Sequence, residues 1–213
     1  FAVLTHGESN QSTNYDGSSY GVEMFGLKDI VATSNPVSSK GANITFGGID
    51  RTTAANAYWK GNVIANGGVN RPITNALIKQ ALLTCEKKQA NMSKVEGWCH
   101  PDVWGTIGLI AIGDRRYIDY KATTELGFEF IKYDGKNIFY DWDCSNNRLY
   151  WLDMSVISML TQSGYDFIED GAILSRVSGR DAYEATLYKD VQQGAKNCNK
   201  LVLLSDLTTA ITV

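Results

Sequence analysis

The sequence predicts an α+β fold, arranged as two interleaved subdomains, and three observations support this prediction. The segment from Arg71 to Gln89 places apolar residues at helical spacing over roughly 16 residues. Further along, the turn dipeptide Asp134-Gly135 separates two apolar and aromatic segments, which is a strong signal for a β-hairpin. Short helices and strands surround these two elements without an internal repeat, which is typical of an α+β fold.

Size and charge narrow the possible functions. The chain has 213 residues, enough to bury a core as one large domain or as two small ones. Its net charge is −3 and it has no basic tail, which argues against tight binding to DNA or to an anionic membrane. Apolar runs are far shorter than the ~18 residues of a membrane span. No signal-peptide pattern follows Phe1, so the chain is either processed or part of a longer product.

The cysteines and glycosylation triplets carry no clear function. The cysteines form no Cys-x-x-Cys pair, and their spacing fits buried free thiols in a reducing compartment better than disulfides or a zinc site. The Asn-x-Ser/Thr triplets lack a secretion signal, so we interpret them as accidental. The cysteines are Cys85, Cys99, Cys144 and Cys198, and the triplets begin at Asn10, Asn43 and Asn91.

The N-terminal third contains loops and short elements. Residues 7–19 are polar and rich in Gly, Ser and Asn, and we expect them to order only against a partner. Phe25 to Val31 is the first apolar segment. Paired glycines at 47 and 48 predict a tight bend. Asp50 follows and can cap a short helix that carries Trp59, the largest apolar group of this region.

The long helix has recognisable boundaries. Thr74 is a suitable N-cap, and Pro72 prevents an earlier start. Ala76 and Leu83 lie opposite the main apolar stripe, so we expect the helix to touch apolar surface on two sides. The main stripe consists of Ile73, Leu77, Ile78, Ala81, Leu82 and Cys85.

Strands dominate the middle of the chain. Lys94 to His100 is expected to form a short strand that ends at Pro101, and Asp102 to Gly108 a helix of one or two turns. Leu126 to Tyr133 and Lys136 to Asp141 are the two arms of the hairpin. A strand over Arg148 to Leu152 follows the next turn.

The C-terminal part is expected to begin with a short helix over Ser155 to Gln162. Two strands, Ala172 to Val177 and Tyr183 to Val191, then flank a Ser-Gly-Arg-Asp turn. Lys200 to Leu204 is apolar enough to be a final buried strand.

No catalytic, cofactor-binding or metal site can be assigned. The usual phosphate-loop, nucleophile-elbow and zinc motifs are absent from the sequence. Cys99 and His100 are neighbours on a predicted strand and would point to opposite faces, and pairing with His6 would require a distant segment to fold over. Asp141 and Asp143 could act as an acid–base pair or bind a cation weakly, but we interpret them as the cap of a turn.

The segments nevertheless occur in a familiar order. GLKDIV, FGGIDR, a Trp-containing segment and the amphipathic helix are followed by HPDVW, LGFEFIKYDGKNIFYDWDC and RLYWLD, and the chain ends with YEATLYKDVQQGAKNCNKLVLLSDL. From Gly26 to Leu207 this order resembles the major capsid proteins of tailed bacteriophages, which have the Hong Kong 97-type fold.

The resemblance implies a division of the chain into a peripheral and an axial domain. Residues 1–92 would form the N-terminal segment and the peripheral domain, with Ile73 to Gln89 as its spine helix. Residues 93–166 would form the axial domain, which clusters around the symmetry axes of the shell. Residues 167–192 would return to the peripheral sheet, and residues 193–213 would supply a final axial strand and a tail.

The resemblance also implies function and partners. The chain would be a non-enzymatic shell subunit that assembles with copies of itself, as pentamers and hexamers, into an icosahedral virion shell around double-stranded DNA. Assembly would take place in the cytoplasm of the bacterial host. Portal, scaffolding or decoration proteins are possible partners, and DNA contact would be weak and non-specific, without a cofactor or a membrane. We expect interface residues at Arg51, Trp59, Arg115, Arg116 and Tyr117.

One departure and two alternatives accompany this interpretation. The family has a long N-terminal arm and an extended loop before the spine helix, and residues 1–24 are too short and polar to form both. We therefore expect part of that region to be absent from the chain.

An encapsulin-like nanocompartment shell, which shares the fold but encloses an enzyme, is one alternative function. A small enzyme that depends on Cys99 or on Asp141 and Asp143 is the other.

Overall fold

Strand β7 (Leu149–Asp153) lies at the centre of the fold, and all five of its residues are buried. Leu149 and Trp151 point into one core cluster, while Tyr150 and Leu152 point into a second cluster on the opposite face. The computed structural model describes residues 26–35, 45–113, 122–123, 129–161, 168–169, 175–176, 181, 183–184, 187–188 and 191–209.

In this part of the chain, β7 belongs to a seven-stranded mixed sheet. It pairs antiparallel with β3 and β14, and these two pair in parallel with β6 and β1 respectively. The antiparallel hairpin β5–β6 and the short strand β4 complete one side. In order across the sheet, the strands are β1 (Asn62–Ile64), β14 (Val202–Leu204), β7, β3 (Val95–Cys99), β6 (Lys136–Tyr140), β5 (Glu129–Tyr133) and β4 (Ala122–Thr123).

Helix α4 (Asn75–Lys87) packs on one face of this sheet, over β14 and β7. The predicted cap is confirmed, because the Thr74 hydroxyl oxygen accepts a hydrogen bond from the Leu77 N–H at 3.3 Å. Ala76 and Leu83 are exposed, so the described part of the chain covers only one side of the helix. The buried positions within the helix are Ile78, Ala81, Leu82 and Cys85.

Helix α5 (Pro101–Gly113) lies on the same face and is longer than the predicted Asp102 to Gly108. It begins at Pro101, whose fixed φ suits the first helical position. Val103 and Ile107 are buried against the sheet. This packing outweighs the low helix propensity of the glycines inside the segment, which is why the sequence alone predicts a shorter helix.

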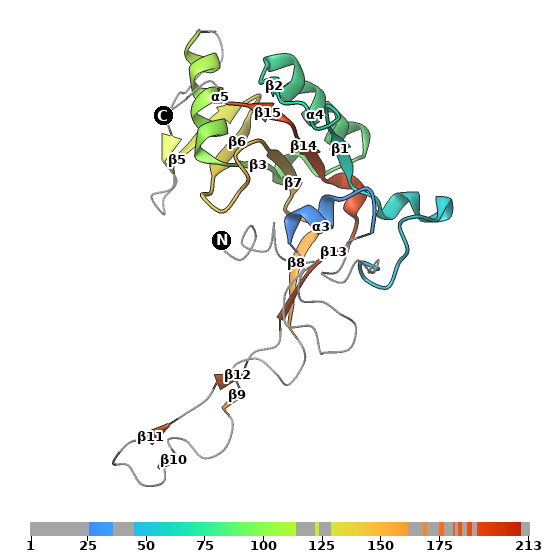
Figure 1. Cartoon of the computed structure of the whole chain (residues 1–213), viewed down its shortest axis with the longest axis vertical. Helices are drawn as coiled ribbons and strands as arrows, with labels where there is room; N and C mark the ends of the chain where they lie inside the picture. Colours follow the sequence, from blue (N-terminus) through green and yellow to red (C-terminus); the bar gives the residue numbers. More distant parts are fainter. Residues whose placement is uncertain are drawn as a thin grey trace.

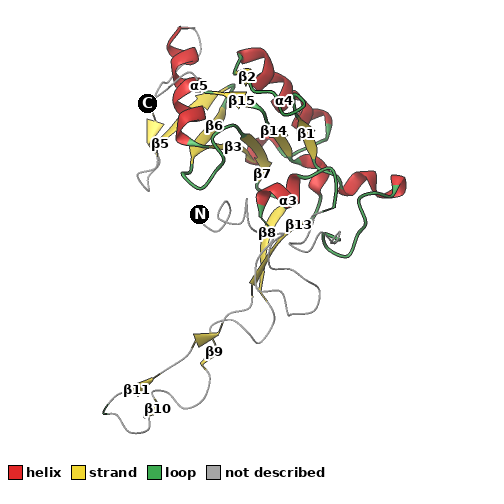
Figure 2. Ribbon diagram, in the orientation of Figure 1, coloured by secondary structure: helices red, strands yellow, loops and turns green. Residues whose placement is uncertain are grey.

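Short elements cover the opposite face of the sheet. These are helix α3 (Leu27–Val31) and the 3-10 helices η1 (Ala54–Trp59) and η3 (Cys198–Lys200), which pack with Phe46, Tyr150 and Leu203. A further 3-10 turn, η2 (Met92–Lys94), leads into β3. Helices and strands therefore form three layers around β7, as the colouring of Figure 2 shows.

The predicted hairpin is confirmed at its turn. Asp134 and Gly135 have φ angles of 49° and 75°, as a two-residue hairpin turn with two left-handed residues requires. Tyr133 pairs with Lys136 across the turn. The strand predictions at 94–100, 148–152 and 200–204 are also confirmed, by β3, β7 and β14.

The helix predicted over Ser155 to Gln162 is wrong. Ile157–Thr161 is instead strand β8, which pairs antiparallel with β13 (Val191–Ala195). A short apolar run is compatible with either a helix or a strand, and here pairing with a distant segment decides for the strand.

The β8–β13 pair leads away from the body, and further short pairs lie beyond it (Figure 1). Strand β9 (Ile168–Glu169) pairs with β12 (Leu187–Tyr188), and β10 (Ser175–Arg176) pairs with β11 (Tyr183–Glu184). The β10–β11 pair falls within the hairpin predicted around residues 178–181. A last parallel pair joins β15 (Leu207–Thr208) to β2 (Arg71–Pro72).

The expected domain boundary at residue 92 does not coincide with a boundary between packed units. Strand β1 and helix α4 precede residue 92. Strand β1 nevertheless belongs to the same sheet as β3, β6 and β7, which follow residue 92, and α4 packs in the same core.

No helix in the described ranges is long and apolar enough to cross a membrane.

Gly61 marks a close approach between two segments and gives a test of the fold. Its N–H donates to the Ala32 carbonyl at 3.0 Å, and a Cβ atom at this position would lie 1.9 Å from the carbonyl oxygen of Val31. We expect Gly61→Ala to lower the free energy of unfolding by about 3 kcal/mol, because backbone atoms must move apart.

Chemical denaturation measures this loss, and Gly135→Asn is the matched control. A Cβ at Gly135 would meet nothing within 4 Å, and Asn tolerates its left-handed backbone. The control should cost less than about 1 kcal/mol. Equal losses in the two variants would contradict the close approach at Gly61.

Candidate assembly surfaces

Arg51, one of the residues expected at a subunit interface, lies in the interior with 0% of its surface exposed. Its guanidinium nitrogens donate hydrogen bonds to backbone carbonyls of three separate segments. The acceptors are the carbonyl oxygens of Ile30 at 2.9 Å, Trp59 at 3.0 Å, Ser34 at 3.3 Å and Asp29. Arg51 therefore ties α3, the loop after it and the end of η1 together, and the interface expectation for this residue is wrong because no part of it reaches the surface.

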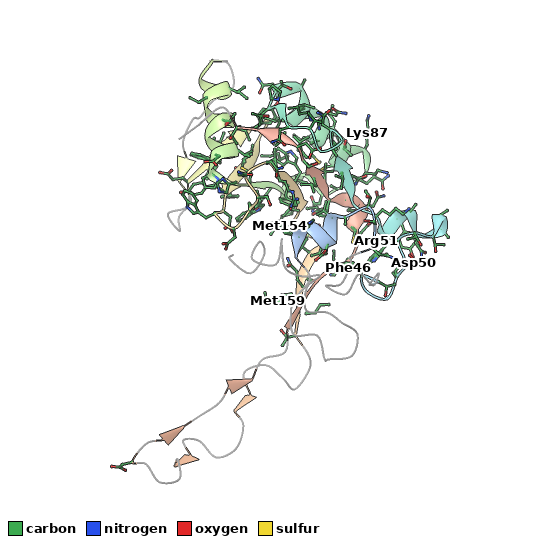
Figure 3. The ribbon with its side chains drawn as sticks, viewed as in Figure 1. Phe46, Asp50, Arg51, Lys87, Met154 and Met159 are labelled. Carbon is green, nitrogen blue, oxygen red and sulfur yellow. The ribbon has the colours of Figure 1, made fainter. Side chains whose placement is uncertain are left out.

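The surroundings of Arg51 explain how a charge is tolerated there. Its guanidinium carbon lies 4.9 Å from the centre of the Phe46 ring, and its Nη2 lies 3.4 Å from Sγ of Cys198. Burial lowers the pKa of Arg51, while the nearby Cys198 and Asp29 act in the opposite direction. Figure 3 shows Phe46, Asp50 and Arg51 gathered on one side of the body.

Trp59 packs beside this cluster and is half-buried. Its ring stacks on Phe46 with centroids 5.7 Å apart, and its indole N–H donates to the Phe46 carbonyl at 2.8 Å. It is thus a packing anchor within the chain, and contact with a neighbouring subunit stays a prediction for it. Arg115, Arg116 and Tyr117 lie outside the described residues.

Asp50 stabilises the turn before η1 rather than capping that helix. Its carboxylate accepts hydrogen bonds from the Thr52 N–H at 2.8 Å, from the Thr52 hydroxyl and from the Asn35 side chain at 2.7 Å. The N-cap position is Thr53, whose side chain makes no capping hydrogen bond. Hydrogen bonding, chiefly from Thr52, lowers the pKa of Asp50 to about 2.

The residues considered for chemistry are held in structural roles. All four cysteines are buried free thiols, as predicted. Burial raises the pKa of Cys99 well above its usual value and that of Cys85 to about 12, so neither supplies a thiolate near neutral pH. The Asp143 N–H donates to Oδ1 of Asp141 at 2.9 Å, which confirms the turn interpretation.

His100 is likewise used locally. Its Nδ1 accepts a hydrogen bond from the Asp102 N–H at 3.2 Å, at the start of α5, and lies 3.2 Å from Oδ2 of Asp102. Within the described part of the chain, no three His, Cys, Asp or Glu side chains are grouped so that they could hold a metal ion.

Exposed apolar side chains are the feature that sequence reasoning missed. Met159 and Leu160, on β8, are 54% and 57% exposed, and Trp142, after β6, is 73% exposed. Met159 and Leu160 were missed because the sequence predicted a helix over their segment. A helix would direct their side chains differently from the strand that the structure contains. Large exposed apolar groups in neighbouring positions indicate an interaction surface.

Replacing Arg51 tests its structural role. In Arg51→Met the carbonyls that it pairs would lose their donors, so we expect a loss of about 3–5 kcal/mol in the free energy of unfolding. Lys28→Met, at an exposed position on α3, is the control and should stay within about 0.5 kcal/mol. An Arg51→Met chain with unchanged stability that fails to associate would restore the original interface prediction.

The low pKa of Asp50 predicts a pH dependence. Because its folded pKa of about 2 lies below the ordinary value of 3.8, its contribution to stability is complete above pH 3.8 and is lost as the pH falls through 2. We expect Asp50→Asn to have a lower Tm than the parent chain at pH 5, with a difference that shrinks towards pH 2. A difference that is constant over thermal melts from pH 5 to pH 2 would contradict this.

No protein-family model and no curated protein sequence matches the chain. Solved structures share its fold at low sequence identity. A subunit of the "Cyanophage A-1(L) capsid asymmetric unit" aligns with 98% of this chain at a TM-score of 0.63 and 17% identity. Subunits of an empty and a native "GTA particle" capsid align with 90% and 91% of it, at TM-scores of 0.55 and 0.52 and 11% identity.

The chain spans less than two thirds of these subunits, namely 65% of the cyanophage subunit and 59% of each GTA subunit. The chain has the α+β fold of phage capsid subunits, the Hong Kong 97-type fold.

Proposed function

We propose that this chain is a major capsid protein whose copies assemble into an icosahedral shell around a double-stranded DNA phage genome. The observation that carries the proposal is the shared fold, which extends over 98% of the chain in the cyanophage capsid comparison. In this proposal the chain has no enzymatic activity and resides in the virion shell, after assembly in the cytoplasm of the bacterial host.

The distribution of apolar surface supports a subunit that associates. Exposed apolar groups occur on several elements, including Leu83 on α4, Leu109 on α5 and Leu160 on β8. A shell subunit needs contacts in several directions, and closed symmetry multiplies contacts that are individually modest. We propose pentamers and hexamers as the assembled units.

Charge supports only weak contact with the genome. The net charge of −3 leaves no excess of cations for binding phosphate groups. Each phosphate neutralised by Lys or Arg adds affinity, so a weakly acidic subunit would let packed DNA move against the shell. Portal, scaffolding and decoration proteins are further partners in this proposal.

The packing suggests how the two family domains map onto this chain. We assign the seven-stranded sheet with α4 and α5 to the axial domain, because these elements share one core. We assign the β8–β13 pair and the strand pairs beyond it to the peripheral domain. In this assignment α4 belongs to the axial domain, which differs from the expected role of Ile73 to Gln89 as the spine helix of the peripheral domain.

Association of the purified chain tests the proposal. Sedimentation velocity over a concentration series, with negative-stain imaging of the largest species, should show pentamers, hexamers, sheets or closed shells. A chain that stays monomeric at every concentration would contradict it. Particles purified from an expressing bacterium should hold no protein cargo, because a protein cargo would favour an encapsulin-like compartment instead.

A further inference from the structure

Asp29, in helix α3, is a buried carboxyl group with an incomplete set of partners. Only 8% of its surface is exposed, and its Oδ2 atom has no hydrogen-bond partner. A buried polar atom is normally hydrogen-bonded, because burial removes the stabilisation that water supplies. The carboxylate form of Asp29 is therefore poorly accommodated at this position.

Arg51 is the cation placed to compensate this charge, but its hydrogen-bond donors are all used elsewhere. A guanidinium group has five N–H bonds. The five acceptors are the carbonyl oxygens of Trp59, Asp29, Ser34 and Ile30 and the Sγ atom of Cys198. Arg51 thus binds the main chain of Asp29, and no N–H remains for a charge-assisted hydrogen bond to the carboxylate.

The groups around Asp29 only partly offset its burial. Burial raises the pKa of Asp29, and the Gly26 backbone, Lys28 and Arg51 oppose this in that order. Helix η3 packs against α3, but its titratable side chain, Cys198, is hydrogen-bonded to Arg51. In the folded chain, the neutral form of Asp29 is favoured more than it would be in water.

Other ionisable groups lie in or against the α3 layer, which comprises residues 26–35, 45–61 and 197–201. These residues contain no histidine, and hydrogen bonding chiefly from Thr52 lowers the pKa of the other acid, Asp50, to about 2. Glu96 lies on the same face of β3 as Trp98, towards this layer, and burial raises its pKa as well. A test therefore has to isolate Asp29. The remaining charged residues of the layer are Lys28, Arg51, Lys60 and Lys200.

We propose that Asp29 is a proton-uptake site that makes the stability of the α3 layer depend on pH. When its carboxyl group is neutral, α3 packs over the sheet without an uncompensated charge. When the group is ionised, the buried charge favours states in which α3 opens to water. This device lies within one chain and does not depend on the proposed shell function.

The direction of the pH effect follows from proton binding. The folded pKa of Asp29 lies above the ordinary value of 3.8, so the folded chain binds this proton more tightly than the unfolded chain. The stabilisation from proton uptake is complete below pH 3.8 and is lost as the pH rises through the folded pKa. The effect is opposite in sign to that of Asp50, whose contribution is lost on acidification.

Amide hydrogen exchange in the parent chain and in Asp29→Asn tests this device. The Gly61 N–H, which donates to the Ala32 carbonyl directly after α3, reports opening of the layer and lies far from the substitution in sequence. We expect it to exchange more slowly in the variant than in the parent at pH 7, because asparagine carries no charge. The ratio of the two rates should shrink towards pH 3, by at most about tenfold per pH unit, since one proton is taken up.

Glu86→Gln is the matched control, because it converts an exposed carboxylate on α4 into an amide. It should change the exchange rate of the Gly61 N–H by no more than about twofold at any pH. Equal exchange in the parent and in Asp29→Asn at pH 7, or faster exchange in that variant, would overturn the proposal.

A second measurement needs no variant. Titration of the Asp29 carboxyl carbon by NMR in the parent chain follows the proton directly. A midpoint above 3.8 supports proton uptake on folding, and a midpoint at or below 3.8 rules it out.

Discussion

The requirement to cover β7 on both faces determines how the rest of the body is arranged. Leu149 and Trp151 need one apolar layer, which α4 and α5 provide, and Tyr150 and Leu152 need another, which α3, η1 and η3 provide. The end of the strand is fixed by Asp153, a fully buried residue whose carboxylate accepts hydrogen bonds from the backbone N–H groups of Asn91 and Ser155. Since elements from both ends of the described chain are needed for this coverage, the body behaves as one packed unit.

The β8–β13 pair differs from the body in how its side chains are covered. The buried guanidinium of Arg51 joins short segments on one face of the sheet, and the core cluster on this face reaches Ile157 at the base of the pair. Beyond that point Gln193 is still buried, whereas its cross-strand partner Met159 and the next residue, Leu160, are more than half exposed. Exposed apolar side chains in neighbouring positions indicate an interaction surface.

Local signals in the sequence predicted the elements whose formation depends on neighbouring residues. Thr74 capped its helix and Asp134-Gly135 formed its turn, because both depend on a few adjacent backbone groups. The strand character of Ile157–Thr161 depends on Val191–Ala195, about thirty residues away, and no local pattern encodes that pairing. Burial of Arg51 could not be predicted either, since its acceptors are carbonyl groups, which every residue carries. Resemblance of segment order indicated the fold, whereas the exposed groups Met159 and Leu160 emerged only from the structure.

Reconstruction of assembled particles by electron cryomicroscopy tests the central claim most directly, because it places every copy of the chain relative to its neighbours. The account predicts a closed shell with icosahedral symmetry, in which the seven-stranded body of each copy lies near a symmetry axis. Associated chains that form no closed shell would contradict it.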